Sequence, residues 1–154
     1  MTMKLNGEPI LAEDLRQPRK WKKGDTIELD LPMKARLIEA NPLVEEVKNQ
    51  IAVMRGPIVY CLEGEDIEGG YRINDIAIPT DIQFTEKKIT ISGHEMIALE
   101  GDAVLVNQDF WDNNTLYRDL RQKKTKKVHI RLIPYYAWDN RGIQDMSIWL
   151  NVRH

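Results

Sequence analysis

The stretch that decides the fold is Val53-Met54-Arg55-Gly56-Pro57-Ile58-Val59-Tyr60-Cys61-Leu62-Glu63. Gly56-Pro57 divides it into two strands, because proline lacks the N–H that a sheet needs and suits the first residue of a strand. The run from Ile58 to Leu62 is apolar throughout, which predicts a central strand covered on both faces. The single cysteine of the chain, Cys61, lies in this run and is predicted to be a buried, unreactive thiol.

Segments that alternate between polar and apolar residues lie on both sides of this stretch. Thr26 to Leu31 alternates without a break, and Lys127 to Ile133 alternates with Val128, Ile130 and Leu132 facing inward. Further strands are expected at residues 35–39, 50–54, 73–78, 82–84, 88–92, 96–100, 103–106 and 146–152. Gly101-Asp102 has the composition of a hairpin turn, and residues 63–70 are acidic and predict a loop.

These patterns predict an all-β fold of about ten short, mostly antiparallel strands, arranged as a β-sandwich or jelly roll. The chain has 154 residues, which favours one domain with room for a fragment of a second. No apolar run approaches the roughly 20 residues of a membrane-spanning helix. One cysteine is compatible with either a reducing or an oxidising compartment, so the localisation stays open.

The charge balance gives no reason to expect nucleic acid or an anionic membrane as a partner. The chain has 22 basic and 24 acidic residues and a net charge of −2. Residues 118–131 hold seven lysines or arginines, with few aromatic residues between them. Two interpretations are a polyanion-binding patch and a solvated hairpin or loop whose lysines protect a sheet edge. The composition favours the solvated hairpin or loop.

Three blocks, taken in order, resemble the C-terminal, non-catalytic β-sandwich region of glycoside hydrolase family 127, the β-L-arabinofuranosidase-like proteins. The first is Arg19 to Met33, with Trp21 and Gly24-Asp25 ahead of the alternating strand. The second is Val53 to Glu63, and the third is Ile133 to Gly142, which is followed by Met146 to Leu150.

In that family the resemblance implies an (α/α)₆ barrel ahead of the sandwiches, with a cysteine nucleophile, a zinc ion and a glutamate acid/base. None of those motifs matches this chain, and Cys61 lies in the wrong block. The resemblance therefore implies no catalytic residue, metal or cofactor. It implies an accessory region that packs on the barrel or mediates a homodimer, in a parent enzyme for arabinose-containing glycans.

The same resemblance implies two parts. Residues 1–33 correspond to the tail of a preceding sandwich, and residues 34–154 correspond to the C-terminal β-sandwich domain. A tail of this kind has lost most of its sheet, so the apolar face formed by Ile27, Leu29 and Leu31 needs a new partner. The C-terminal sandwich or a second copy of the chain would supply one.

The segment after the Lys127–Ile133 strand is the main candidate for a ligand or domain contact. It combines aromatic rings with amide, carboxylate and guanidinium groups, the mixture that binds sugars. The candidate residues are Tyr135, Tyr136, Trp138, Asp139, Asn140 and Arg141. Three interpretations stay open: a turn in which Arg141 pairs with a nearby carboxylate, a contact with another domain, and direct glycan binding.

Other candidate sites have simpler interpretations. The loop Gln108 to Thr115 carries carboxylates and amides that suit Ca²⁺, but it lacks the glycine and regular spacing of an EF-hand and favours a solvated loop. His94 and His129 do not form a metal-ligand spacing. The alternatives to an accessory region are a dimerisation module and a stand-alone carbohydrate-binding module, with Tyr135, Tyr136, Trp138 or Trp111 as its platform.

Overall fold

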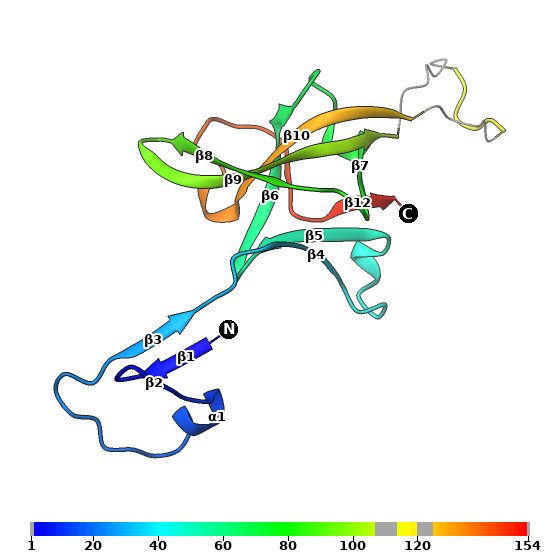
Figure 1. Cartoon of the computed structure of the whole chain (residues 1–154). Helices are drawn as coiled ribbons and strands as arrows, with labels where there is room; N and C mark the ends of the chain where they lie inside the picture. Colours follow the sequence, from blue (N-terminus) through cyan, green and yellow to red (C-terminus); the bar gives the residue numbers. More distant parts are fainter. Residues whose placement is uncertain (1, 107–113, 120–124, 154) are drawn as a thin grey trace. The chain divides into compact units, whose positions relative to one another are not determined.

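The computed structural model describes residues 2–106, 114–119 and 125–153, and the chain divides into two compact units, residues 1–34 and 35–154 (Figure 1). Residues 108–113 of the oxygen-rich loop, including Trp111, lie outside the described residues, as do Lys123 and Lys124 of the basic stretch. Among the described residues no helix has the length and apolar character needed to cross a membrane.

The N-terminal unit contains a small antiparallel sheet in the order β2-β1-β3. Its elements are β1 (Thr2–Leu5), β2 (Glu8–Pro9), the one-turn helix α1 (Ala12–Leu15) and β3 (Ile27–Asp30). Asn6-Gly7 joins β1 to β2 with φ angles of 51° and 85°, the conformation for which an Asn-Gly pair is suited. Within this unit, Ile27 and Leu29 of β3 are 48% and 53% exposed.

The second unit is built almost entirely from strands. They are β4 (Ala35–Glu39), β5 (Gln50–Arg55), β6 (Ile58–Ile67), β7 (Ile76–Pro79), β8 (Thr85–Ile91), β9 (His94–Leu105), β10 (Lys126–Pro134), β11 (Met146–Ser147) and β12 (Leu150–Arg153). Three short 3₁₀ helices, Glu45–Val47, Ile73–Asp75 and Tyr135–Ala137, connect them.

Six of these strands close into a barrel in the order β6-β10-β9-β7-β12-β5, with β5 paired again to β6. The closure happens at β5, because one edge of this strand pairs with β6 near Val53 and with β12 near Ile51. Strand β12 runs parallel to β7, and the other strand pairs in the sheet are antiparallel. Strands β4, β8 and β11 extend the barrel at its flanks.

The predicted all-β, mostly antiparallel fold is confirmed, but the predicted open β-sandwich or jelly roll is wrong for the main sheet. A sandwich leaves sheet edges at its sides, and here the shared edge of β5 and the parallel β7–β12 pair remove them. The alternation of polar and apolar residues does not depend on which distant strands pair with each other. The pattern therefore does not distinguish an open sandwich from a closed barrel.

The main apolar cluster draws side chains from all six barrel strands and fills the barrel interior. Its members include Ile51, Val53, Tyr60, Leu62, Ile76, Ile78, Leu99, Leu105, Ile130, Leu132 and Leu150. A second cluster, formed by Cys61, Ile91, Met96, Ile133 and Ala137, covers the opposite face of β6. Strand β6 is therefore apolar on both faces, as its continuous apolar run predicts, and Val128, Ile130 and Leu132 of β10 are buried as expected.

Several local predictions are wrong. Strand β6 continues to Ile67 through the expected acidic loop, and β9 passes straight through Gly101-Asp102, while the hairpin turn lies at Ser92-Gly93. Residues 82–84, expected to be a strand, lie outside the strands. Gly101 does not form a turn; it allows β9 to lie close to the segment 82–84. A Cβ atom on residue 101 would lie 3.2 Å from the Gln83 carbonyl oxygen and 3.2 Å from side-chain atoms of Ile82 and Phe84.

Replacing Gly101 with alanine is therefore expected to lower the free energy of unfolding by about 1 kcal/mol, because the backbone of Gln83 has to move. Urea denaturation measures the change. Gly64→Ala is the matched control, since a Cβ atom at that strand glycine would lie 3.9 Å from its nearest neighbours, an ordinary van der Waals contact. The control should be neutral or slightly stabilising, and equal effects at both positions would contradict this account of Gly101.

Cys61 is fully buried, and its burial raises the pKa of the thiol to about 12. At a pH near 8, roughly one thiol in ten thousand is then ionised, so a disulfide reagent should react with the native chain only on the timescale of unfolding. The same reagent should react at once in urea. Rapid modification of Cys61 in the folded chain would show that the thiol is accessible and the assignment as an inert core residue is wrong.

Candidate functional site

The loop that follows β10 brings the six candidate residues into one segment. It begins with the 3₁₀ helix Tyr135–Ala137 and turns at Asp139 and Gly142, whose φ angles are 64° and 114°. The side-chain amide of Asn140 donates to the carbonyl oxygens of Ala137 and Trp138, both at 3.1 Å. The hydroxyl of Ser92 donates to the Asn140 carbonyl at 2.9 Å, which ties this loop to the β8–β9 hairpin.

Arg141 lies between carboxylates from the C-terminal half of β6. Its Nε donates to Glu63 Oε2 at 3.0 Å, its Nη1 donates to Asp66 Oδ1 at 3.1 Å, and its Nη2 contacts both carboxylates. Glu65 Oε1 lies 2.6 Å from the same Nε. The backbone N–H of Asp139 donates to the second oxygen of Glu63 at 3.1 Å, so one buried carboxylate holds two points of the loop.

The contacts of Arg141 with Glu63 and Asp66 are shielded from water, whereas Glu65 is 45% exposed. The side chains of Glu63 and Asp66 are 0% and 3% exposed, and that of Arg141 is 19% exposed. Burial by itself would lower the pKa of Arg141, but hydrogen bonds to Asp66 and Glu63 outweigh it and raise the pKa. A buried ion pair with several hydrogen bonds fixes the loop geometry, since each carboxylate needs its partner in place.

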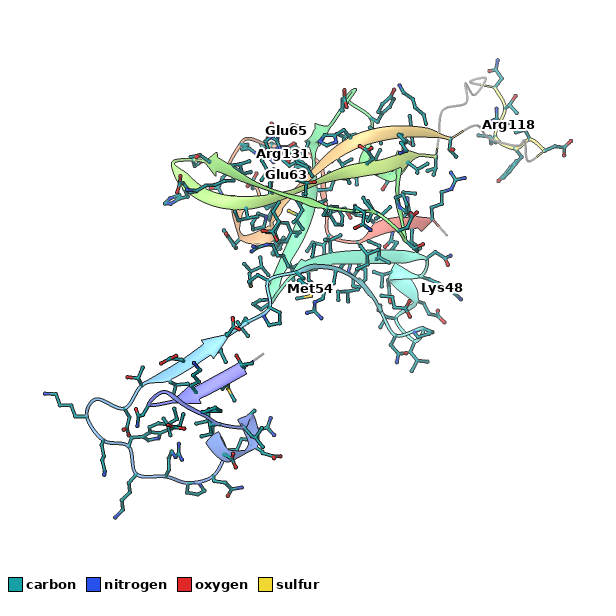
Figure 2. All side chains as sticks on the ribbon, in the orientation of Figure 1. Lys48, Met54, Glu63, Glu65, Arg118 and Arg131 are labelled. Carbon is teal, nitrogen blue, oxygen red and sulfur yellow. The ribbon has the colours of Figure 1, made fainter. Side chains whose placement is uncertain are left out.

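The charged contacts continue from this cluster across β10 and β9. Arg131 Nη1 lies 3.9 Å from Asp66, and Arg131 Nη2 lies 2.7 Å from Glu100 on the neighbouring strand. Figure 2 labels Glu63, Glu65 and Arg131, which lie in the region where β6 pairs with β10. Beyond Glu100, a hollow of about 540 Å³ is lined by charged and polar residues that include Asp102, Lys127 and His129.

The aromatic residues of the loop remain accessible to a partner. The rings of Tyr135 and Trp138 stack at 6.0 Å between centroids with an angle of 6° between their planes, and both are partly exposed. Tyr136 is 66% exposed and lines a separate cavity of about 290 Å³. The other residues that line this cavity are Ile91, Ser92, His94, Met96, Ala137 and Asn140.

The sequence predicted that the six candidate residues lie in one loop, but it did not predict which carboxylates pair with Arg141. Glu65 and Asp66 fell in a segment expected to be a loop, and Glu63 stood at the expected end of the strand, whereas all three lie on β6. The signal that points to a strand is Ile67, an apolar residue after the acidic run that enters the barrel core. Among the described residues no group of three or more histidine, cysteine or carboxylate side chains is placed to hold a metal ion.

Replacing Arg141 with methionine leaves Glu63 and Asp66 buried without their counter-charge, which is expected to lower the free energy of unfolding by about 3 kcal/mol or more. Urea denaturation with tryptophan fluorescence measures the loss. Lys88→Met is the control, because Lys88 and its partner Glu95 are 64% and 65% exposed, and such surface pairs contribute about 0–1 kcal/mol. A loss at Arg141 no larger than at Lys88 would refute the buried cluster as the support of the loop.

Comparison with known proteins identifies the family. Residues 35–151 match the glycoside hydrolase family 127 C-terminal domain. The chain is 33% identical to a non-reducing end β-L-arabinofuranosidase of Bifidobacterium longum subsp. longum, over 96% of this chain and 23% of that protein. It is also similar to two solved structures, and each similarity covers 99% of this chain.

One of these structures is a glycoside hydrolase, at 44% identity with a TM-score of 0.78 and 26% of that chain covered. The other is a family 127 β-L-arabinofuranosidase from Geobacillus stearothermophilus T6, at 34% identity with a TM-score of 0.77 and 24% of that chain covered. The chain thus spans about a quarter of the length of the relatives it matches. It belongs to the glycoside hydrolase family 127 C-terminal domain family and is related to the β-L-arabinofuranosidases.

Proposed function

We propose that the chain is a non-catalytic accessory region of a larger family 127 glycoside hydrolase. The observation that carries this proposal is that the whole chain aligns with only about a quarter of each relative, in a part that the family match describes as C-terminal. The catalytic barrel of the parent enzyme would then lie in the preceding part of that protein. Because two of the relatives are named β-L-arabinofuranosidases, the substrate of the parent would be an arabinose-containing glycan.

The geometry of the acidic residues supports a structural role. A retaining or inverting glycosidase presents two carboxyl groups to a sugar, one of them as a proton donor. In the cluster around Arg141, the guanidinium occupies both oxygens of Asp66 and Oε2 of Glu63, the Asp139 N–H occupies Oε1 of Glu63, and Glu63 is fully buried. Cys61, the single thiol of the chain, is buried in the second apolar cluster. These groups stabilise the domain and are not arranged to attack a glycoside.

The two units would have different roles in the parent. Residues 1–33 would be the tail of a preceding sandwich, whose remaining strands cover the half-exposed Ile27 and Leu29. Residues 34–154 would form the C-terminal domain, which packs on the catalytic barrel or joins two copies of the enzyme. The stacked rings of Tyr135 and Trp138 supply an exposed, rigid aromatic surface for such a domain contact.

A second function has an observation in its favour. The same stacked rings are the kind of platform on which sugar C–H faces pack, so a stand-alone carbohydrate-binding module is the alternative. The two functions differ in what the chain binds: a protein domain in one case and a glycan polymer in the other.

The test uses the genomic reading frame that encodes this chain. The full product should hydrolyse an aryl β-L-arabinofuranoside, the chain alone should not, and the chain should form a stable complex with the separately produced upstream part in light scattering. Trp138→Ala should weaken that complex about tenfold or more, as removal of an interface aromatic does. Tyr117→Ala, which removes another exposed ring, is the control and should leave the complex unchanged.

Two results would count against the accessory role. Hydrolysis by the chain alone would place catalysis within it. A reading frame confined to the chain, combined with retention of the chain on arabinan, would favour the carbohydrate-binding module.

A further inference from the structure

The cavity beside Tyr136 differs in chemistry from the other hollows of the barrel domain. Within the described part of the chain, its lining contains no aspartate, glutamate, lysine or arginine. The hollow over β9 and β10, by contrast, is lined by Asp81, Glu100, Asp102 and Lys127. A site without charged walls does not favour an ion, because a charged ligand would lose water there without gaining a counter-charge.

The cavity has an apolar base and a polar rim. Ile91, Met96 and Ala137 are buried members of the second apolar cluster and form the apolar part of the lining. Ser92, His94, Asn140 and the ring of Tyr136 complete it. A ligand that fits has one apolar face and hydroxyl groups around its edge, which describes a neutral sugar ring.

The polar groups of the rim retain hydrogen-bonding capacity. The amide nitrogen of Asn140 is used by the carbonyls of Ala137 and Trp138, which leaves its side-chain oxygen as an acceptor without a partner in the described part of the chain. Ser92 donates its hydroxyl proton to the Asn140 carbonyl and keeps its oxygen lone pairs. Acceptors of this kind suit the hydroxyl donors of a sugar.

The walls of the cavity are held in place before any ligand arrives. One wall belongs to the β8–β9 hairpin and the other to the loop after β10, and the Ser92–Asn140 hydrogen bond joins them at 2.9 Å. Arg141, next to Asn140, anchors the loop to buried Glu63 and Asp66. A preformed site loses little freedom when it binds a small ligand.

We propose that the cavity lined by Tyr136, His94 and Asn140 is a binding site for a single neutral sugar ring. Its volume of about 290 Å³ is at the lower end of ligand pockets, which suits one ring instead of an oligosaccharide. The choice of an arabinofuranosyl unit rests on the proposed function, in which the parent enzyme acts on arabinose-containing glycans. The site would bind a glycan branch next to the surface formed by Tyr135 and Trp138.

The experiment is a titration of the ¹⁵N-labelled chain with methyl β-L-arabinofuranoside, followed by amide chemical shifts. Saturable shifts are expected at Ile91, Met96, Ala137 and Asn140, with a dissociation constant on the order of 1 mM, as for small ligands with few contacts. Tyr136→Ala should weaken binding about tenfold, because it removes the aromatic wall of the cavity. His94→Ala, on the opposite wall, should weaken it as well.

Tyr135→Ala is the matched control, since the adjacent tyrosine stacks on Trp138 and does not line the cavity. Binding to this variant should stay within about twofold of the original chain, and unchanged shifts away from the cavity show that each variant is folded. Absence of saturable shifts in the original chain would overturn the proposal. So would loss of binding in Tyr135→Ala with retention in Tyr136→Ala, which would place the sugar on the stacked rings.

These outcomes are separate from those for the accessory role. Complex formation with the upstream part tests that role, and it neither requires nor excludes a sugar in this cavity. A chain that forms the complex but shows no saturable shifts retains the accessory role and loses the sugar site.

Discussion

Closure of the sheet at β5 is the constraint on which the second unit depends. One edge of this short strand pairs with β6 near one end and with β12 near the other, and the ring of six strands is complete only when both pairings form. Closure creates an interior to which every barrel strand contributes apolar side chains. It also gives β6 and β10 a fixed outer face, on which the second apolar cluster and the charged contacts of Arg141 are built.

The position of the candidate site depends on β6, because different residues of this strand face the barrel interior, the second apolar cluster and Arg141. Residues Tyr60 and Leu62 face the interior, Cys61 faces the outer cluster, and the strand then continues with Glu63 and Asp66 in contact with Arg141. The acidic half of one strand thereby sets the position of a loop more than seventy residues later in the sequence. The aromatic residues of that loop are exposed because the ionic contacts and Asn140, and not the burial of the rings, hold it in shape.

The local patterns of the sequence predicted much of the fold, and the failures share a cause. Alternation identified β3 and β10 and the inward residues of β10, and the apolar run identified the doubly covered part of β6. The missed features depend on partners far away in sequence. Gly101 was expected to mark a turn because a local pattern does not include the neighbouring segment at Gln83, and the acidic residues of β6 were assigned to a loop because their partner Arg141 is distant in sequence. Barrel closure is the same kind of event, since it joins β12 to β5 and β7.

The late position of β12 in the chain has a consequence for biosynthesis. Strands β5 and β7 are made about a hundred and about seventy residues earlier, yet the gap between them is filled only by Leu150–Arg153. Closing such long loops is slow and gains nothing until the last strand arrives. While the chain is still on the ribosome, the unfinished sheet exposes two unpaired edges, which are the sites at which nascent chains associate incorrectly. The barrel therefore closes only after β12 has been synthesised, and until then the edges of β5 and β7 that β12 will cover stay unpaired.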